Sequence, residues 1–204
     1  MIDPSTIRLI AITDHIRDGQ TGLIARAAAA AHGGASCIQL RLKDVSARDL
    51  VGVARELVRA VGVPVIVNDR SDVAIAAGAA GVHLGADDIP ASAIRKIAPA
   101  GFIIGVSVGN DVEVAGSADA DYVGIGPFFA TGSKSDAGEP IGPEGFSRLA
   151  AAAGLPAVAV GGVTAENAAV AMSAGAAGIA VIGGVFASTD PAAAARRLRS
   201  AIGI

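Results

Sequence analysis

Aromatic side chains, cysteine and positive charge are all scarce in this chain. Aromatic residues make up 3% of its 204 residues and tryptophan is absent, so aliphatic side chains, alanine and glycine must build the core. The only cysteine, Cys37, cannot form an internal disulfide, and we interpret it as a small buried side chain in a reduced cytoplasm. A formal net charge of −3 leaves no basic excess, so we do not expect nucleic acid as a partner.

Signals for export and for membrane insertion are missing as well. The N-terminus does not join a charged segment to an apolar run, so no signal peptide is predicted. Residues 168–187 are uncharged and long enough to span a bilayer, but glycines divide them into a helix, a turn, a strand and a second turn. These glycines are Gly175, Gly178, Gly183 and Gly184. We therefore expect a soluble, cytoplasmic chain with no membrane partner.

What the sequence does contain is an alternation of short β-rich runs and helical patterns along its whole length. Strands are predicted at Arg8–Thr13, Ser36–Leu40, Val63–Val67, Gly81–Leu84, Phe102–Val106, Tyr122–Ile125, Ala157–Val160 and Gly178–Ile182. Helices are predicted at Gly22–His32, Ala47–Ala60, Asp72–Ala77, Ala91–Ile97, Val112–Ala118, Pro143–Ala153, Ala165–Ala174 and Pro191–Ala201. Ser46, Thr164 and Asp190 stand where helix N-caps are expected.

Eight such strand–helix units follow one another without a linker or a change in composition. The pattern predicts an α/β protein with a single (β/α)₈ TIM barrel, in which residues 1–204 form one domain. An open, doubly wound sheet is the alternative architecture, and the count of eight units disfavours it.

Polar residues cluster just after the predicted strands, which is where barrels of this kind carry their active sites. After the second strand, the alternation of Gln39, Arg41 and Lys43 points all three side chains to one side. The other strand ends and the loop after the sixth strand add Asn68, Asp69, His83, Asp87, Asp88, Ser107, Thr131, Ser133, Lys134, Gly161, Gly162, Gly183 and Gly184.

Several of these residues also have a structural interpretation. Asp69 is equally suited to capping the next helix, and His83 to a structural hydrogen bond. Of the adjacent carboxylates we expect only one to face the site, namely Asp88 rather than Asp87. The paired glycines would also serve as simple turns.

Two carboxylates are expected to meet at this mouth, because Asp69 and Asp88 follow neighbouring strands. Unpaired carboxylates would repel each other, whereas Mg²⁺ favours a pair of them together with phosphate oxygens and water. With Mg²⁺, the positive charges of Arg41, Lys43 and Lys134 suit a pyrophosphate.

A second, metal-free anion site is expected at the glycines after the last two strands. Backbone N–H groups near helix N-termini form the usual phosphate site of such barrels. The glycines concerned are Gly161, Gly162, Gly183 and Gly184. Two anion sites in one barrel mouth predict transfer between two phosphorylated substrates, with pyrophosphate as the leaving group.

The segments that carry this chemistry read IAITD, CIQLRLK, VIVNDR, GVHLGADD, GVSV, DYVGIGPFFATGSK and AVGGV. In order and spacing they resemble the thiamine phosphate synthase family over essentially the whole chain. The resemblance implies a Mg²⁺-dependent enzyme that joins a hydroxymethylpyrimidine diphosphate to a thiazole phosphate and releases thiamine monophosphate and pyrophosphate. It also implies a dissociative mechanism, in which a pyrimidinyl-methyl cation forms before the thiazole nitrogen attacks.

The resemblance further implies a role for each matching residue. A pyrophosphate clamp would consist of Arg41, Lys43 and Lys134, with Ser107 as a further hydrogen-bonding group. Asp69 and Asp88 would bind Mg²⁺. The remaining positions would contact substrate: Gln39 and Asn68 at the pyrimidine and diphosphate, Thr131 and Ser133 in the sixth loop, and Gly162 with the glycines after the last strand at the thiazole phosphate.

Four positions depart from the family pattern. They are Ile10 for the usual aromatic residue, Ala86 for a common Gln, Gly109 for a frequent His and Gly183 for a frequent Ser. These positions are expected near the organic parts of the substrates, so the identity of the pyrimidine and the thiazole stays open.

Two other functions compete with this interpretation. A thiazole tautomerase of the same superfamily would need a His at the place of Gly109, and a non-catalytic sensor of thiamine phosphates would not need the clamp. The sequence also leaves open whether the chain forms a homo-oligomer.

Overall fold

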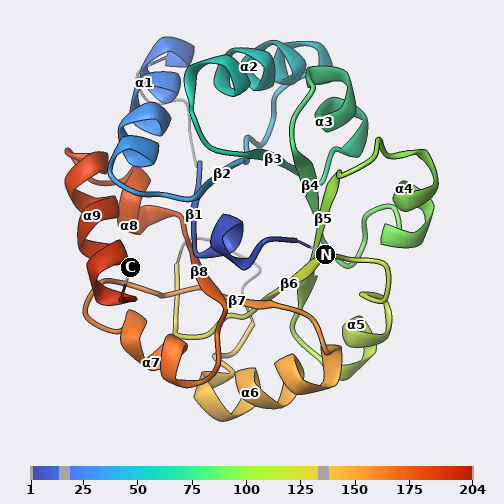
Figure 1. Cartoon of the computed structure of the whole chain (residues 1–204), viewed down its shortest axis with the longest axis vertical. Coiled ribbons are helices and arrows are strands. Elements are labelled where there is room, and N and C mark those ends of the chain that lie inside the picture. The colour runs from blue at the N-terminus through green and yellow to red at the C-terminus, as the bar shows by residue number, and fades with distance from the viewer. Residues whose placement is uncertain (1, 14–18, 133–137, 204) are drawn as a thin grey trace.

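Eight parallel strands close into a barrel in chain order (Figure 1). The computed structural model describes residues 2–13, 19–132 and 138–203. Neighbouring strands pair in parallel all the way round, and β1 closes the ring by pairing with β8. The strands are β1 (Leu9–Ile12), β2 (Cys37–Leu40), β3 (Val65–Asn68), β4 (Gly81–Leu84), β5 (Ile103–Val108), β6 (Tyr122–Ile125), β7 (Ala157–Val160) and β8 (Gly178–Val181). The predicted TIM barrel is therefore confirmed.

Helices surround the barrel (Figure 1). They are α1 (Gly19–His32), α2 (Ala47–Ala60), α3 (Ser71–Ala77), α4 (Ala91–Ile97), α5 (Asp111–Ala115), α6 (Gly142–Ala153), α7 (Ala168–Ser173), α8 (Gly183–Phe186) and α9 (Pro191–Ala201). The uncharged segment 168–187 is divided into α7 and β8, as its glycines predict, but the short helix α8 stands where a second turn was predicted. In the described part of the chain, no helix combines the length and the apolar character needed to cross a membrane.

Two of the three predicted caps are confirmed. The Ser46 hydroxyl accepts a hydrogen bond from the Asp49 N–H at the start of α2, and the Asp190 carboxylate accepts one from the Ala193 N–H at the start of α9. The prediction at Thr164 was wrong, because its backbone N–H donates to the side chain of Asn167 and α7 begins only at Ala168.

The strand pleat separates two cores. One core, which includes Leu9, Ile38 and Val123, packs between the strands and the helices. The other fills the barrel and includes Ile10, Ile66 and Val158. These inward positions alternate with the outward ones along each strand, as the pleat requires.

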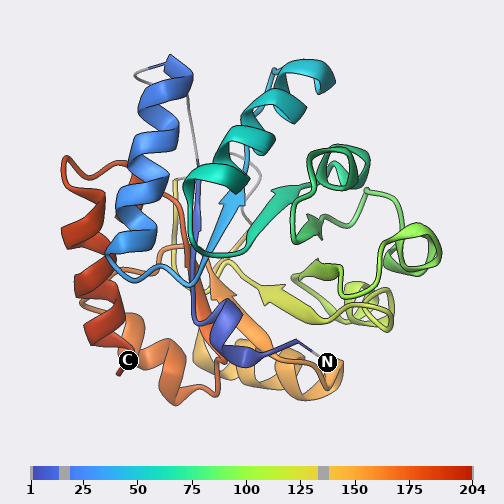
Figure 2. The same ribbon diagram turned by 45° about the horizontal axis from the view of Figure 1, so that its top comes forward.

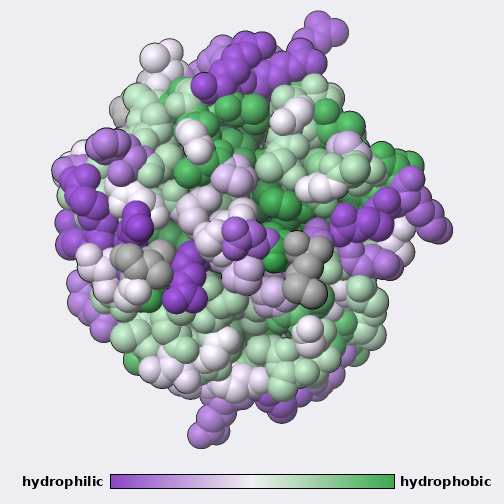
Figure 3. All heavy atoms as spheres, viewed as in Figure 1, coloured by the Kyte–Doolittle hydropathy of each residue, from purple (hydrophilic) through white to green (hydrophobic). Residues whose placement is uncertain are grey.

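A short 3₁₀ helix that the sequence did not predict, η1 (Pro4–Ile7), closes one end of the barrel. Its residue Ile7 is buried and packs with the inner core. Figure 2 shows η1 at the end opposite the arrowheads of β2 and β3. Figure 3 shows this closed face, on which both chain ends lie and hydrophilic residues gather over α2 and α9. A ligand therefore enters from the other end, where the strands terminate.

The one tyrosine of the chain depends on a glycine in the next strand. Tyr122 is fully buried inside the barrel and pairs in register with Gly105 on β5. A Cβ atom at position 105 would overlap the Tyr122 ring. Glycine here supplies the space that an aromatic side chain needs in a barrel built from small residues.

We expect Gly105→Ala to lower the free energy of unfolding by about 1–3 kcal/mol, because the enclosed ring cannot move aside. Gly52→Ala is the matched control: position 52 is exposed on α2 with open space around it, so alanine should stabilise the helix by about 0.5–1 kcal/mol. Urea unfolding of both variants measures the difference. Equal stability of the two variants would contradict this account of the barrel interior.

Candidate active site

One pocket of about 810 Å³ occupies the mouth where the strands end. Its size falls in the range of ordinary small-molecule sites. The predicted site residues that line it are Gln39, Asp69, Asp88, Ser107, Thr131, Gly161, Gly162, Gly183 and Gly184. Chain segments far apart in sequence thus meet at one cavity, as the barrel topology demands.

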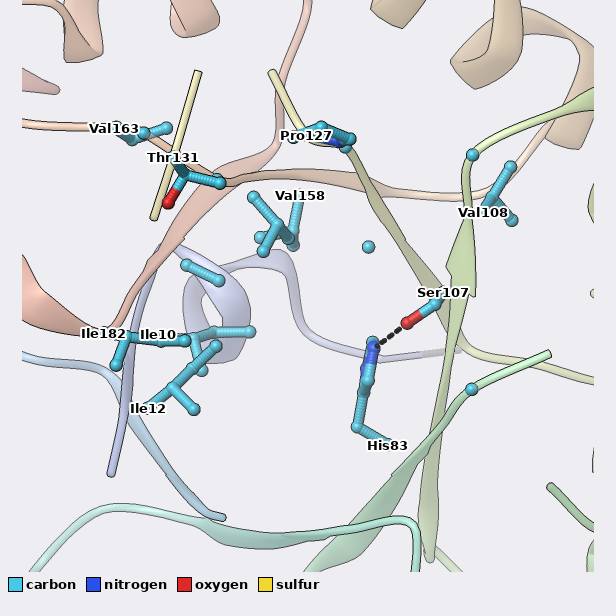
Figure 4. A pocket seen from close by; sticks show the side chains of 18 of the residues that line it. Ile10, Ile12, His83, Ser107, Val108, Pro127, Thr131, Val158, Val163 and Ile182 are labelled. Carbon is cyan, nitrogen blue, oxygen red and sulfur yellow. Dashed lines mark hydrogen bonds between the residues drawn. The ribbon is translucent and has the colours of Figure 1, made fainter. Parts of the chain in front are cut away.

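The pocket has an apolar wall and a polar wall. In Figure 4, Ile10, Ile12 and Ile182 lie across the cavity from His83 and Ser107. Such a pair of walls suits an organic ring that carries polar substituents on one side.

At the end of β2, a buried threonine holds the backbone of Arg41. The Thr13 hydroxyl accepts a hydrogen bond from the Arg41 N–H at 2.8 Å and donates one to the Arg41 carbonyl at 3.0 Å. The Thr13 N–H donates to the Gln39 carbonyl, which ties the ends of β1 and β2 together. Sequence reasoning missed Thr13, because a lone threonine after a strand carries no recognisable signal.

The predicted cations stand beside the pocket rather than in its wall. Arg41 is only 8% exposed and Lys43 is exposed; neither is among the pocket-lining residues, and the same holds for Asn68 at the end of β3. The described residues offer the Arg41 guanidinium no acidic partner. Ser133 and Lys134 lie outside the described residues.

The two predicted metal ligands both line the pocket. Asp69 is exposed and adopts a left-handed backbone conformation (φ 63°), and its N–H donates to the His83 carbonyl at 2.7 Å. One Asp88 oxygen accepts a hydrogen bond from the Gly85 N–H at 2.6 Å. Asp88 is half-buried, whereas Asp87 is exposed. In the described part of the chain, no group of three or more His, Cys, Asp or Glu side chains is placed to hold a metal.

Carboxylates dominate the charge of the described wall. Asp69, Asp87, Asp88, Glu113 and Glu139 all line the pocket, and no lysine or arginine among the described residues does so. Such a wall favours cations at the mouth.

Ser107 lies inside β5, not after it as predicted, because the strand continues to Val108. Its hydroxyl hydrogen-bonds His83 Nε2 at 3.0 Å, and His83 Nδ1 hydrogen-bonds the Tyr122 hydroxyl at 2.9 Å. Burial raises the pKa of Tyr122 well above its usual value. Burial also raises the pKa of Cys37 to about 12, so this thiol remains protonated.

The glycine half of the mouth depends on close backbone approach. A Cβ at Gly161 would overlap Pro127, and one at Gly162 would overlap the backbone at residues 129–130. Both glycines also have positive φ, so the space and the conformation both exclude larger residues. Gly183 and Gly184 open α8, whose first N–H groups have no partner within the helix.

Two loop supports were also missed by sequence reasoning. Glu113 accepts a hydrogen bond from the Gly109 N–H at 2.6 Å, while Asn110 caps α5. The Asn-x-x-Glu spacing of a capping box was a usable signal for this pair. The Asn167 side-chain amide donates a hydrogen bond to the Gly162 carbonyl at 2.9 Å, and no local sequence pattern predicts that contact.

The four departures from the family pattern all face the pocket. Ile10, Ala86, Gly109 and Gly183 are among its lining residues. The differences are therefore concentrated where a ligand would lie.

A closed (β/α)₈ barrel with a polar pocket at its strand ends defines a TIM-barrel enzyme. A family model described as thiamine monophosphate synthase matches residues 9–185, and the chain belongs to this family, whose members are transferases.

Individual relatives match the chain over nearly its full length. A thiamine-phosphate synthase of Methanoculleus marisnigri is 50% identical, with 95% of this chain and 94% of the relative covered. One of Azorhizobium caulinodans is 44% identical, with 99% and 98% covered. The structure of a thiamine phosphate pyrophosphorylase from Pyrococcus furiosus is similar to this one, with a TM-score of 0.85 and 32% sequence identity. The superposition covers 98% of this chain and 96% of the pyrophosphorylase chain.

We expect Thr13→Val to lower the free energy of unfolding by about 1–3 kcal/mol, because it leaves the buried Arg41 N–H and carbonyl without their hydroxyl partner. Thr13→Ser keeps the hydroxyl and should cost about 0.8 kcal/mol for the lost methyl group. Chemical denaturation compares the three proteins. A valine variant as stable as the serine variant would show that the hydroxyl does not support this strand end.

Proposed function

We propose that the chain catalyses the thiamine-phosphate synthase reaction, in which a hydroxymethylpyrimidine diphosphate and a thiazole phosphate give thiamine monophosphate and pyrophosphate. The observation that carries the proposal is a single pocket bounded on one side by Asp69, Asp88 and Ser107 and on the other by paired glycines. Relatives 42–50% identical to the chain are named thiamine-phosphate synthases, which supports the same reaction.

Arg41, Lys43 and Lys134 would bind the leaving diphosphate. Arg41 forms no ion pair with an acidic side chain among the described residues, so its positive charge is available to an anionic ligand. Lys43 lies just after the same strand and is exposed, so its flexible side chain can reach that ligand. The role of Lys134 rests on the sequence pattern alone.

The donor set at Asp69 and Asp88 fits Mg²⁺. Mg²⁺ is usually held by one or two carboxylates and completes its shell with phosphate oxygens and water, so two aspartates in one pocket are sufficient. Asp88 keeps one oxygen for a metal while the other binds the Gly85 N–H. When bound, Mg²⁺ would neutralise charge on the departing diphosphate.

The organic rings would lie between the two anion sites. Gln39, at the end of β2, lines the pocket and would present its amide to a pyrimidine edge, and Asn68, at the end of β3 beside the pocket, would bind the same substrate. The apolar wall of Ile10, Ile12 and Ile182 would pack against the ring faces (Figure 4). Thr131, with Ser133, would add hydroxyl groups from the sixth loop.

The thiazole phosphate would bind at Gly161, Gly162, Gly183 and Gly184. Exposed backbone N–H groups bind phosphate without a side chain, and the two positive-φ glycines let the ligand approach closely.

In the reaction, the bond between the pyrimidine methylene carbon and the diphosphate oxygen breaks, and that oxygen keeps the electron pair. The cationic methylene is then attacked by the thiazole nitrogen, whose lone pair forms the new carbon–nitrogen bond. The chain itself contributes positioning and charge stabilisation, so no protein nucleophile is required. We place this chemistry in the cytoplasm, where small phosphorylated substrates are its partners.

The test is thiamine phosphate formation from the two substrates, with and without Mg²⁺. Asp88→Asn keeps an oxygen for the Gly85 N–H but removes the charge, so we expect kcat/KM to fall roughly 100-fold. Asp69→Ala and Lys134→Ala should also abolish most turnover. Asp72→Asn is the control, because this exposed carboxylate pairs with Arg70 away from the pocket.

Undiminished turnover in EDTA, or in the Asp88 variant, would overturn the metal-assisted mechanism. Substrate binding without product would favour a non-catalytic sensor, and isomerisation of a thiazole substrate alone would favour a tautomerase.

A further inference from the structure

A chain of hydrogen bonds runs from the barrel interior to the pocket. The Tyr122 hydroxyl contacts His83 Nδ1 at 2.9 Å, and His83 Nε2 contacts the Ser107 hydroxyl at 3.0 Å. The three residues come from β6, β4 and β5. Tyr122 is 1% exposed and His83 9%, whereas Ser107 is half-buried at the pocket wall, where Figure 4 shows its contact with the His83 ring.

The direction of proton donation along these hydrogen bonds is assigned from Tyr122, the buried end of the series. Burial keeps Tyr122 protonated by raising its pKa, so the phenol has a proton to donate. His83 Nδ1 lies at hydrogen-bond distance from the phenol oxygen, 2.9 Å, so we assign the phenol proton to this contact and the acceptor role to Nδ1. An imidazole that accepts at Nδ1 carries its proton on Nε2 and donates it to the Ser107 oxygen.

This direction decides what Ser107 can do. Its oxygen already accepts from Nε2, so its own proton cannot go to His83 and points elsewhere. The layout of hydroxyl, imidazole and third group resembles an activated nucleophile, but there the imidazole must accept the hydroxyl proton. Here Nε2 is a donor, so Ser107 is a hydrogen-bond donor to a ligand and not a nucleophile.

We propose that Tyr122 and His83 are positioning residues that fix the Ser107 hydroxyl as a donor to an anionic oxygen of the leaving diphosphate. The inference rests on the proposed function and deepens it, because it identifies how a rotatable hydroxyl is held in one orientation. A donor held ready in this way acts on charge that develops as the carbon–oxygen bond breaks.

A double-mutant cycle on kcat tests the relay. We expect Ser107→Ala to lower kcat roughly 10- to 100-fold, the effect of losing a hydrogen bond to a charged group, and Tyr122→Phe to lower it roughly 3- to 10-fold. Tyr122→Phe should cause no further loss in the Ser107→Ala background, because it acts only through Ser107. Ser117→Ala, which removes a buried hydroxyl away from the pocket, should leave kcat unchanged.

The two proposals fail in different ways. Full activity of Ser107→Ala would contradict the role of Ser107 in the proposed function. Impaired Ser107→Ala with an additive loss from Tyr122→Phe would overturn the relay and leave the proposed function standing.

The His83 tautomer gives a readout that does not depend on activity and is measured on the wild-type protein. The chain has three histidines, so ¹⁵N-detected spectra of the wild-type protein can be assigned with a single His83→Gln variant. We expect a protonated Nε2 and an unprotonated Nδ1 in the ligand-free protein. A protonated Nδ1 would reverse the direction of the chain and overturn the relay.

Discussion

Closure of the barrel between β1 and β8 is the constraint on which the site depends. Because all eight strands run parallel and the ring is closed, every strand ends at the same mouth. Residues as distant as Gln39 and Gly183 then line one pocket, although they share no local structure. The pleat adds a second condition, since every other residue of each strand faces the inside, where Gln39 and His83 belong.

The interior of the barrel also explains why so few aromatic residues suffice. Among the described residues of its inner core, Tyr122 is the only aromatic side chain, and it fits only because Gly105 faces it. That one aromatic side chain begins the hydrogen-bonded chain through His83 to Ser107. The packing of the closed interior and the orientation of a polar group in the open pocket thus depend on the same residue.

Local patterns predicted the fold well because each strand–helix unit carries its own periodicity and turn residues. They also located the polar strand ends, since position along a strand fixes which end a residue occupies. They did not predict η1, whose single turn is stabilised by burial of Ile7 against the barrel, or the hydroxyl bridge of Thr13 to β2. Both depend on contacts between segments, which no local pattern encodes. The placement of Arg41 and Lys43 beside the pocket wall likewise depends on contacts between segments.

The account centres on a divalent cation held by Asp69 and Asp88 together with a diphosphate. A crystal grown with Mn²⁺ in place of Mg²⁺ and with inorganic pyrophosphate tests it directly, because the anomalous signal of Mn²⁺ locates the ion. We predict an anomalous peak between the carboxylates of Asp69 and Asp88, in contact with pyrophosphate oxygens near Ser107 and Arg41. Bound pyrophosphate with no peak between these two carboxylates would contradict the account.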